Sequence, residues 1–183
     1  MNLNPFAMAA AMIFFAGSVF GQNQIVKNSD FKEGLKNWLS EKKLALPATE
    51  TGFAIETVDG AQCLAAIGTG KQDVHSFQIV QHIDLPQSAL LGKRVTFSAD
   101  IKPINISGTF LFMIREGAKK KSIRYRKITL NKWSQKEWKR YTAEFVVCKP
   151  TEFIQIYFQA NYLEPGDKIL VKNLSVTITD RSK

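Results

Sequence analysis

The strongest constraint on the fold is a strict two-residue alternation of apolar and polar side chains in the segment Arg94–Pro103, RVTFSADIKP. Every second position is apolar, namely Val95, Phe97, Ala99 and Ile101. Because successive side chains of a β-strand point to opposite faces of its sheet, this pattern predicts a strand with one buried face.

Six further segments are predicted as strands, with Gly and Pro residues in several of the connections between them. They are Phe77–Leu85, Phe110–Arg115, Ile123–Leu130, Tyr141–Lys149, Phe153–Asn161 and Ile169–Thr179. Helical periodicity is weak throughout, and Phe31–Leu39 has room for one short turn at most. Short alternating runs at this spacing predict an all-β, two-layer antiparallel β-sandwich.

The N-terminus has the features of a signal peptide. Residues 1–21 carry no charged side chain, and their apolar run Ala7–Phe15 is too short to cross a membrane as a helix. Val19 and Gly21 are small enough for the −3 and −1 positions of a signal-peptidase site. We therefore expect residues 22–183 to form one secreted, periplasmic or extracellular domain. An uncleaved N-terminal anchor is the alternative.

The formal net charge is +9, from 25 Lys and Arg against 16 Asp and Glu. The basic residues gather between Lys119 and Arg140. Such a surface attracts polyanions, which for an exported protein means acidic polysaccharide, lipid headgroups or anionic cell wall before nucleic acid. A solvated basic face that only keeps the protein soluble is the alternative.

Cysteine and histidine are scarce. Cys63 and Cys148 are too few for a disulfide framework. In an exported protein they can pair, and as isolated residues they can simply pack as small side chains, so both readings stay open. The histidines, His75 and His82, have no zinc-type spacing, and we expect no metal or cofactor.

Four segments, in order, resemble the carbohydrate-binding modules of families four, nine and twenty-two. Ile25–Trp38, IVKNSDFKEGLKNW, resembles their opening motif, and Leu90–Pro103, Glu137–Val147 and Ile169–Ile178 resemble three of their strands. The resemblance implies a jelly-roll-like sandwich with glycan bound in a concave face, and structural roles for the tryptophans of the first and third segments. A fold alone does not determine a function.

Two positions depart from the family pattern, which has Glu where this chain has Lys32 and Asp where it has Lys172. In many relatives these carboxylates lie beside a structural calcium. Calcium requires oxygen ligands, which ammonium groups cannot supply. We expect the calcium site to be lost, with a lysine in the cation's place bonded to Asp30 or to backbone carbonyls.

No sequence motif indicates catalysis. The chain lacks a nucleophile elbow, a metal-binding histidine pair and a phosphate loop. No sequence context marks any glutamate as one of the paired carboxylates of a glycosidase. We expect a secreted, non-catalytic protein that binds a polysaccharide or glycan. The alternatives are a structural or protein-interaction domain of a secreted or envelope assembly and, third, an enzyme.

The candidate binding surface is the strand Phe153–Asn161. Its apolar positions are predicted to face the core, so that Gln155, Tyr157 and Gln159 face away from it. Aromatic rings stack on the CH-rich faces of sugars, and amides bond their hydroxyls. We therefore expect an exposed Tyr157 ring to contact glycan, with a glutamine on either side. An ordinary solvent face is the alternative.

Other residues are predicted to extend this groove. Arg115 and Tyr125 are expected to share it, and the guanidinium would favour a uronic or sulfated glycan through charge-assisted hydrogen bonds. Trp133 lies in the polar stretch NKWSQKEW and is a second candidate platform, with a packed loop anchor as the alternative.

Overall fold

The computed structural model describes residues 23–40, 52–69, 76–86, 90–119 and 121–180. Eleven strands form in these ranges: β1 (Asn23–Gln24), β2 (Leu39–Ser40), β3 (Phe53–Val58), β4 (Ala61–Ile67), β5 (Ser76–Asp84), β6 (Arg94–Asn105), β7 (Thr109–Ala118), β8 (Lys121–Asn131), β9 (Lys139–Val146), β10 (Phe153–Asn161) and β11 (Lys168–Thr179). A search of these ranges finds no helix suited to crossing a bilayer. The predicted signal peptide and His75 lie outside them.

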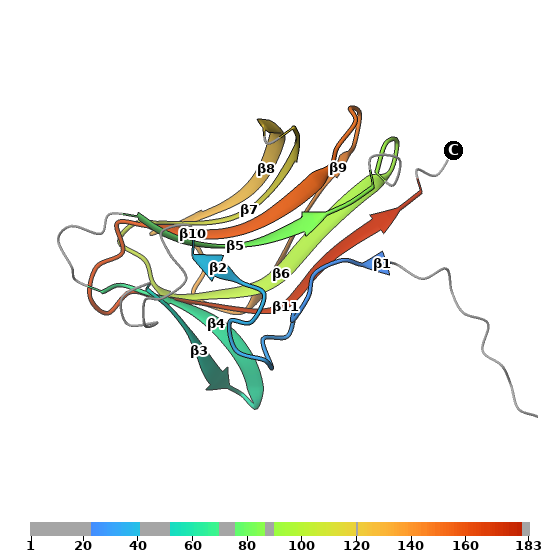
Figure 1. Ribbon diagram of the computed structural model, residues 1–183. Helices are drawn as coiled ribbons and strands as arrows, with labels where there is room; N and C mark the ends of the chain where they lie inside the picture. Colours follow the sequence, from blue (N-terminus) through green and yellow to red (C-terminus); the bar gives the residue numbers. More distant parts are fainter. Residues whose placement is uncertain (1–22, 41–51, 70–75, 87–89, 120, 181–183) are drawn as a thin grey trace, which may run out of the picture.

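The strands form two antiparallel sheets that face each other, as the sequence predicted (Figure 1). The first sheet has the order β3-β4-β11-β6-β9, and β1 pairs with β11. The second has the order β2-β5-β10-β7-β8. In Figure 1 the strands of the second sheet bend, and their concave side is turned away from β6 and β11.

The apolar face of β6 lies in the core, which confirms the interpretation of its alternation. Val95, Phe97, Ala99 and Ile101 are fully buried. Phe97 meets Phe112 of the opposite sheet edge-on at 5.1 Å between ring centroids, and Phe112 stacks on Phe158 at 5.0 Å. Burying each such side chain contributes about 1.5–3 kcal/mol, so this ring cluster is a main source of stability.

The hairpin of β3 and β4 was not among the predicted strands. Its turn is Asp59-Gly60, and both residues have positive φ, 52° and 75°. Asp-Gly between two strands is a strong signal for a tight hairpin, because this turn requires left-handed backbone at both positions.

The opening motif forms a series of turns rather than a helix, and Asn28 holds it together. Its side-chain nitrogen donates to the carbonyls of Gly34 and Lys36, at 2.8 Å and 3.1 Å, and its oxygen accepts from the backbone of Glu33 at 3.0 Å. These bonds let Trp38 turn into the core, where it packs on Phe158 with the ring centroids 5.5 Å apart.

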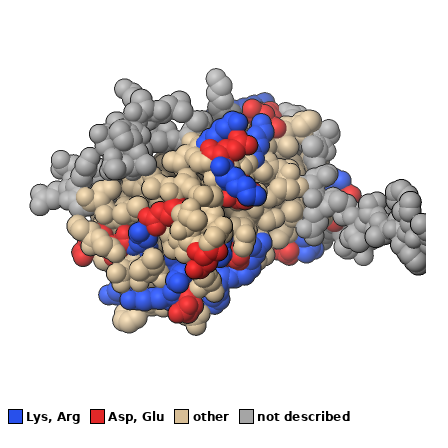
Figure 2. Space-filling view, turned by 90° about the horizontal axis from the view of Figure 1, so that it is seen from below, with Lys and Arg blue, Asp and Glu red and all other residues tan. Residues whose placement is uncertain are grey.

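The outer face of the first sheet carries charges of both signs in close pairs. Lys168 pairs with Glu56 at 2.8 Å, Arg94 with Glu144 at 2.9 Å and Arg140 with Asp100 at 3.2 Å. Figure 2 shows the molecule from the side of β3 and β4, with Lys and Arg interspersed among Asp and Glu. The net positive charge is therefore not concentrated as one uniform patch on this face.

Candidate functional site

One row of four side chains crosses the second sheet. The strand pairing places His82 of β5 opposite Gln155 of β10, Gln155 opposite Arg115 of β7, and Arg115 opposite Tyr125 of β8. Three strand spacings separate the ends of this cross-strand row, a span of about 14 Å. The row thus brings two rings, an amide and a guanidinium onto one surface.

The cross-strand row lies on the face that is turned away from the sandwich interior. Ile154, Ile156 and Phe158 of β10 belong to the core between the sheets, so the intervening Gln155 and Tyr157 point outward. This confirms the alternation predicted for β10. Because the sheet bends with its concave side outward, the row lies on the concave face (Figure 1).

Arg115 and Gln155 form the centre of the row. The guanidinium donates to the Oε1 atom of Gln155 through Nε at 2.7 Å and also through Nη2. Within the described residues, neither the Nη1 of Arg115 nor the Nε2 of Gln155 has a hydrogen-bond partner. The pair therefore leaves N–H donors for the acceptor oxygens of a ligand.

Tyr157 differs from the prediction, because its ring is not open to a ligand. Only 2% of the residue is exposed. The Arg115 guanidinium carbon lies 5.0 Å from the ring centroid, and the hydroxyl donates to the Gln155 oxygen at 2.9 Å. Tyr157 is also opposite the buried Val80 and the half-buried Met113. The ring thus supports Arg115 and Gln155 from beneath.

Tyr125 is the exposed aromatic residue of this face. It is 56% exposed and lies on the edge strand β8, opposite Arg115. An exposed ring beside a guanidinium can stack on the apolar face of a ligand while its hydroxyl stays in water. Tyr125, which was expected to share the groove with Arg115, therefore supplies the exposed ring that was expected from Tyr157.

His82 completes the row and was not among the predicted site residues. Its ring stacks on Phe153 with centroids 5.0 Å apart, and its Nε2 lies 2.9 Å from a carboxylate oxygen of Asp84. Phe153 fits there because it is opposite Gly117, where a Cβ atom would lie 2.2 Å from the ring. Only the pairing of β5 with β10 shows that His82 joins the row.

Gln159 and Trp133 lie outside the row. Gln159 is four residues along β10 from Gln155, and its amide nitrogen donates to Ser76 at 3.2 Å and to Asn161 at 2.9 Å. Trp133 follows the far end of β8, is 82% exposed and has the Lys132 ammonium 5.2 Å from its ring centroid. Gln159 lies on the same face of the sheet, whereas Trp133 belongs to the β8–β9 loop.

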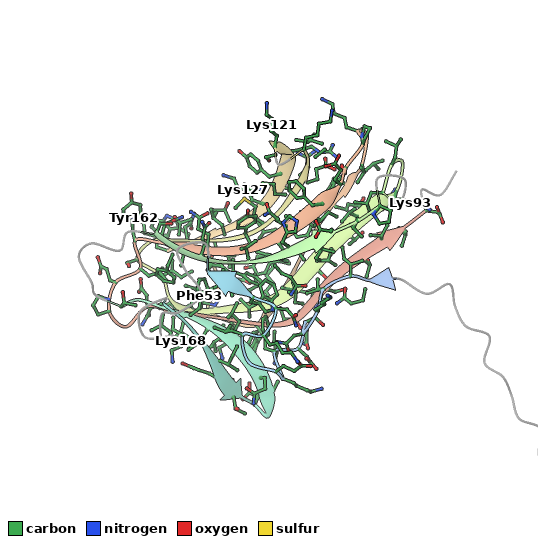
Figure 3. The ribbon with its side chains drawn as sticks, viewed as in Figure 1. Phe53, Lys93, Lys121, Lys127, Tyr162 and Lys168 are labelled. Atoms are coloured by element: carbon green, nitrogen blue, oxygen red, sulfur yellow. The ribbon has the colours of Figure 1, made fainter. Side chains whose placement is uncertain are left out.

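Several cations of the second sheet have no carboxylate partner in the part of the chain that the structure describes. Among the described residues, Arg115, Lys121 and Lys127 form no ion pair with a carboxylate. Figure 3 shows Lys121 and Lys127 on β8, on the opposite side of the molecule from Lys168 of the first sheet. The second sheet therefore presents cations that no carboxylate of the described residues neutralises, as the first sheet does at Lys139 and Lys172, which lie over aromatic rings.

The two lysines at the family's carboxylate positions behave differently from each other. Lys32 pairs with Asp30 at 2.8 Å, as expected, and this hydrogen bond lowers the pKa of the aspartate. Lys172 instead lies over the ring of Trp138, with its ammonium 4.1 Å from the centroid. The described residues contain no group of three or more His, Cys, Asp and Glu suited to a metal ion.

Both cysteines are free thiols, so Cys63 and Cys148 do not form the disulfide that the sequence left open. Cys63 is fully buried in a small cluster with Ala65 and Leu170 on the outer side of the first sheet, beside the half-buried Trp138. Burial raises the pKa of the Cys63 thiol. Cys148 is exposed just after β9.

No protein-family model and no curated protein matches the chain. Solved structures do share its fold. A family 16 carbohydrate-binding module matches 85% of this chain and 99% of its own at 13% identity and a TM-score of 0.59. A family 61 module, solved in complex with β-1,4-galactotriose, matches 85% and 99% at 15% identity and a TM-score of 0.54.

The same fold occurs in an enzyme. A cyclase from Fischerella sp. TAU matches 86% of this chain and 97% of its own at 10% identity and a TM-score of 0.63. The chain thus has the jelly-roll fold of carbohydrate-binding modules, as the sequence resemblance implied. At these identities the likeness establishes the fold alone, and the function has to be argued from the site.

Proposed function

We propose that this protein is an exported, non-catalytic domain that binds glycan on the concave face of its second sheet. The observation that carries the proposal is the cross-strand row, in which the exposed Tyr125 ring lies beside the unused donors of Arg115 and Gln155. Sugars need both elements, because their CH faces stack on rings and their oxygens accept hydrogen bonds.

The similarity to carbohydrate-binding modules supports this proposal, since two of the solved neighbours are named as such modules. The proposal is also supported by the fact that the binding residues are already held in place without a ligand. Arg115 is held by Gln155 and Tyr157 without a ligand, so little side-chain entropy remains to be lost on binding. In our proposal Tyr157 positions these two residues and does not itself touch the glycan.

An acidic glycan is the preferred ligand in this proposal. Arg115 and Lys127 lie on neighbouring strands of the binding face without a neutralising carboxylate, and charge-assisted hydrogen bonds are about twice as strong as neutral ones. A uronate or sulfate group would therefore bind near the Arg115 end of the row, with Tyr125 under the adjoining ring.

A glycan array followed by calorimetry tests the proposal. We expect the protein to bind uronic or sulfated oligosaccharides, with an affinity that falls as salt is added because exposed charges are screened over about 8–10 Å. Binding to neutral sugars alone would refute the acidic preference. Binding to protein partners alone would favour the interaction-domain alternative, and turnover of a polysaccharide would favour an enzyme.

Export is the part of the proposal that rests on the N-terminal sequence. We expect the protein recovered outside the cytoplasm to begin at Gln22, after cleavage following Gly21. N-terminal sequencing or intact mass of the exported protein tests this, and a chain that still begins at Met1 would contradict it.

A further inference from the structure

A pocket of about 140 Å³ opens at an edge of the sandwich, lined by Glu116, Ile123, Arg124, Cys148 and Lys149. Its first three residues come from the hairpin of β7 and β8, and the last two come from the segment that runs from β9 to β10. In Figure 1 the turn after β9 stands beside this hairpin. Because side chains alternate along a strand, Glu116 and Arg124 face away from the cross-strand row.

One wall of the pocket is an ion pair with a buried carboxylate and several further contacts. Glu116 is 2% exposed, and its carboxylate accepts from the Nε of Arg124 at 2.6 Å and from the hydroxyl of Thr151 at 3.2 Å. Arg124 also donates through Nη2 to the carbonyl of Val146 at 2.6 Å and lies 5.0 Å from the ring centroid of Phe145. The guanidinium therefore has a fixed position at the pocket.

The charges of the pocket do not balance. The single carboxylate of Glu116 is neutralised by Arg124, whereas the ammonium of Lys149 and the Nη1 of Arg124 have no partner within the described ranges. The site thus has one uncompensated positive charge and N–H donors on two side chains. Such a site favours an anion with planar or tetrahedral oxygens.

The size and the apolar wall narrow the choice of ligand. Ile123 contributes a hydrocarbon side chain, and the volume of about 140 Å³ is close to the roughly 150 Å³ of an engineered cavity that binds benzene. A bare phosphate would leave this apolar wall uncovered. A carboxylate carried on one compact ring would use both the donors and the wall.

We propose that the pocket binds a small organic anion, a carboxylate on a ring-sized apolar body, through Arg124 Nη1 and Lys149. The site is separate from the glycan face and does not depend on the function proposed for that face. Cys148 provides a built-in reporter, because this exposed residue lines the pocket while Cys63 is buried. A bound ligand should shield Cys148 from alkylation.

The experiment measures the alkylation rate of Cys148 by iodoacetamide in the purified protein, with and without sodium benzoate at constant ionic strength. We expect saturating benzoate to slow the reaction at least fivefold, while neutral benzamide and inorganic phosphate leave the rate unchanged. An unchanged rate with benzoate, or equal protection by benzamide or phosphate, would overturn the proposal.

Variants identify the residues responsible, with protection expressed as the ratio of rates with and without benzoate. Lys149→Gln should abolish protection, and the matched Lys127→Gln on the glycan face should retain it. Replacing Arg124 would leave Glu116 buried without its partner, so Ile123→Phe serves as the second variant because it fills the pocket and leaves the ion pair intact. Protection that persists in both Lys149→Gln and Ile123→Phe would contradict this site.

Discussion

The Nε of Arg115 donates to the side-chain oxygen of Gln155 at 2.7 Å, which joins the neighbouring strands β7 and β10 on the concave face. The same oxygen accepts from the hydroxyl of Tyr157 at 2.9 Å. Saturating this acceptor orients the amide so that its nitrogen is directed to ligand or water. Recognition on this face is therefore expected to depend on donors, with the ring of Tyr125 beside them.

The geometry of Arg115, and not only its charge, should be needed for binding. Arg115→Lys keeps the charge but loses the planar fork that reaches both Gln155 and a ligand. We expect acidic-glycan affinity to fall about tenfold, a change of ~1.4 kcal/mol, in calorimetry. Lys102→Ala, on the opposite sheet, is the control and should leave affinity unchanged. Equal affinity of Arg115→Lys and the parent would place the anion elsewhere.

Tyr125 should matter for binding and not for stability. Tyr125→Ala removes an exposed ring, so we expect affinity for glycan to fall about tenfold while the free energy of unfolding changes by less than about 0.5 kcal/mol. The exposed Trp133 on the β8–β9 loop is the matched control. If Trp133→Ala weakens binding and Tyr125→Ala does not, the loop is the site.

Tyr157 should matter for stability first. Because the ring is buried, Tyr157→Ala leaves a cavity and should cost about 3 kcal/mol in urea denaturation. Tyr157→Phe keeps the ring, removes the hydrogen bond to Gln155 and should cost about 1 kcal/mol. A loss below 0.5 kcal/mol for the alanine variant would show that the ring does not support the face.

The ion pair of the buried Glu116 and the partly exposed Arg124 should be strongly coupled. Arg124→Met leaves the buried carboxylate uncompensated and should cost about 3 kcal/mol, while Glu116→Leu should cost less because Arg124 is partly exposed. The double variant should be more stable than either single variant. Denaturation of all four proteins gives the coupling energy, and additive losses would show that the two side chains act independently.

The two thiols should respond differently to reagent and to pH. In the native protein Cys148 should react and Cys63 should not, and both should react after unfolding. Since burial raises the pKa of Cys63, the folded state disfavours its thiolate, so its contribution to stability is complete below the ordinary thiol pKa and declines as pH rises above it. Cys63→Ala should therefore lose less stability than the parent at alkaline pH, and an identical pH profile would contradict this.

Alternation along single strands was sufficient to predict much of this architecture. The bounds of β10 agree with the predicted segment Phe153–Asn161. In β6 the alternating apolar residues, such as Val95 and Phe97, are the buried ones, as predicted. Both follow from local geometry, because a period of two residues is a property of one strand. The same reasoning missed β3 and β4, whose signal is the Asp59-Gly60 turn rather than alternation.

The site itself depends on register between strands, which no single segment contains. His82 and Tyr125 join Arg115 only because β5, β10, β7 and β8 pair as they do. Tyr157 is likewise buried although it points outward, so an outward position on β10 does not make a ring accessible. Alternation predicts the face on which a side chain lies, while its exposure depends on the three-dimensional surroundings of that face.

The most direct measurement is a titration of the ¹⁵N-labelled protein with an oligogalacturonate, followed by ¹H–¹⁵N correlation spectra. The account predicts that the largest shift changes occur at His82, Gln155, Arg115 and Tyr125, along one row of the concave face. Changes centred on Trp133 and the β8–β9 loop, or no changes with any acidic glycan, would contradict it.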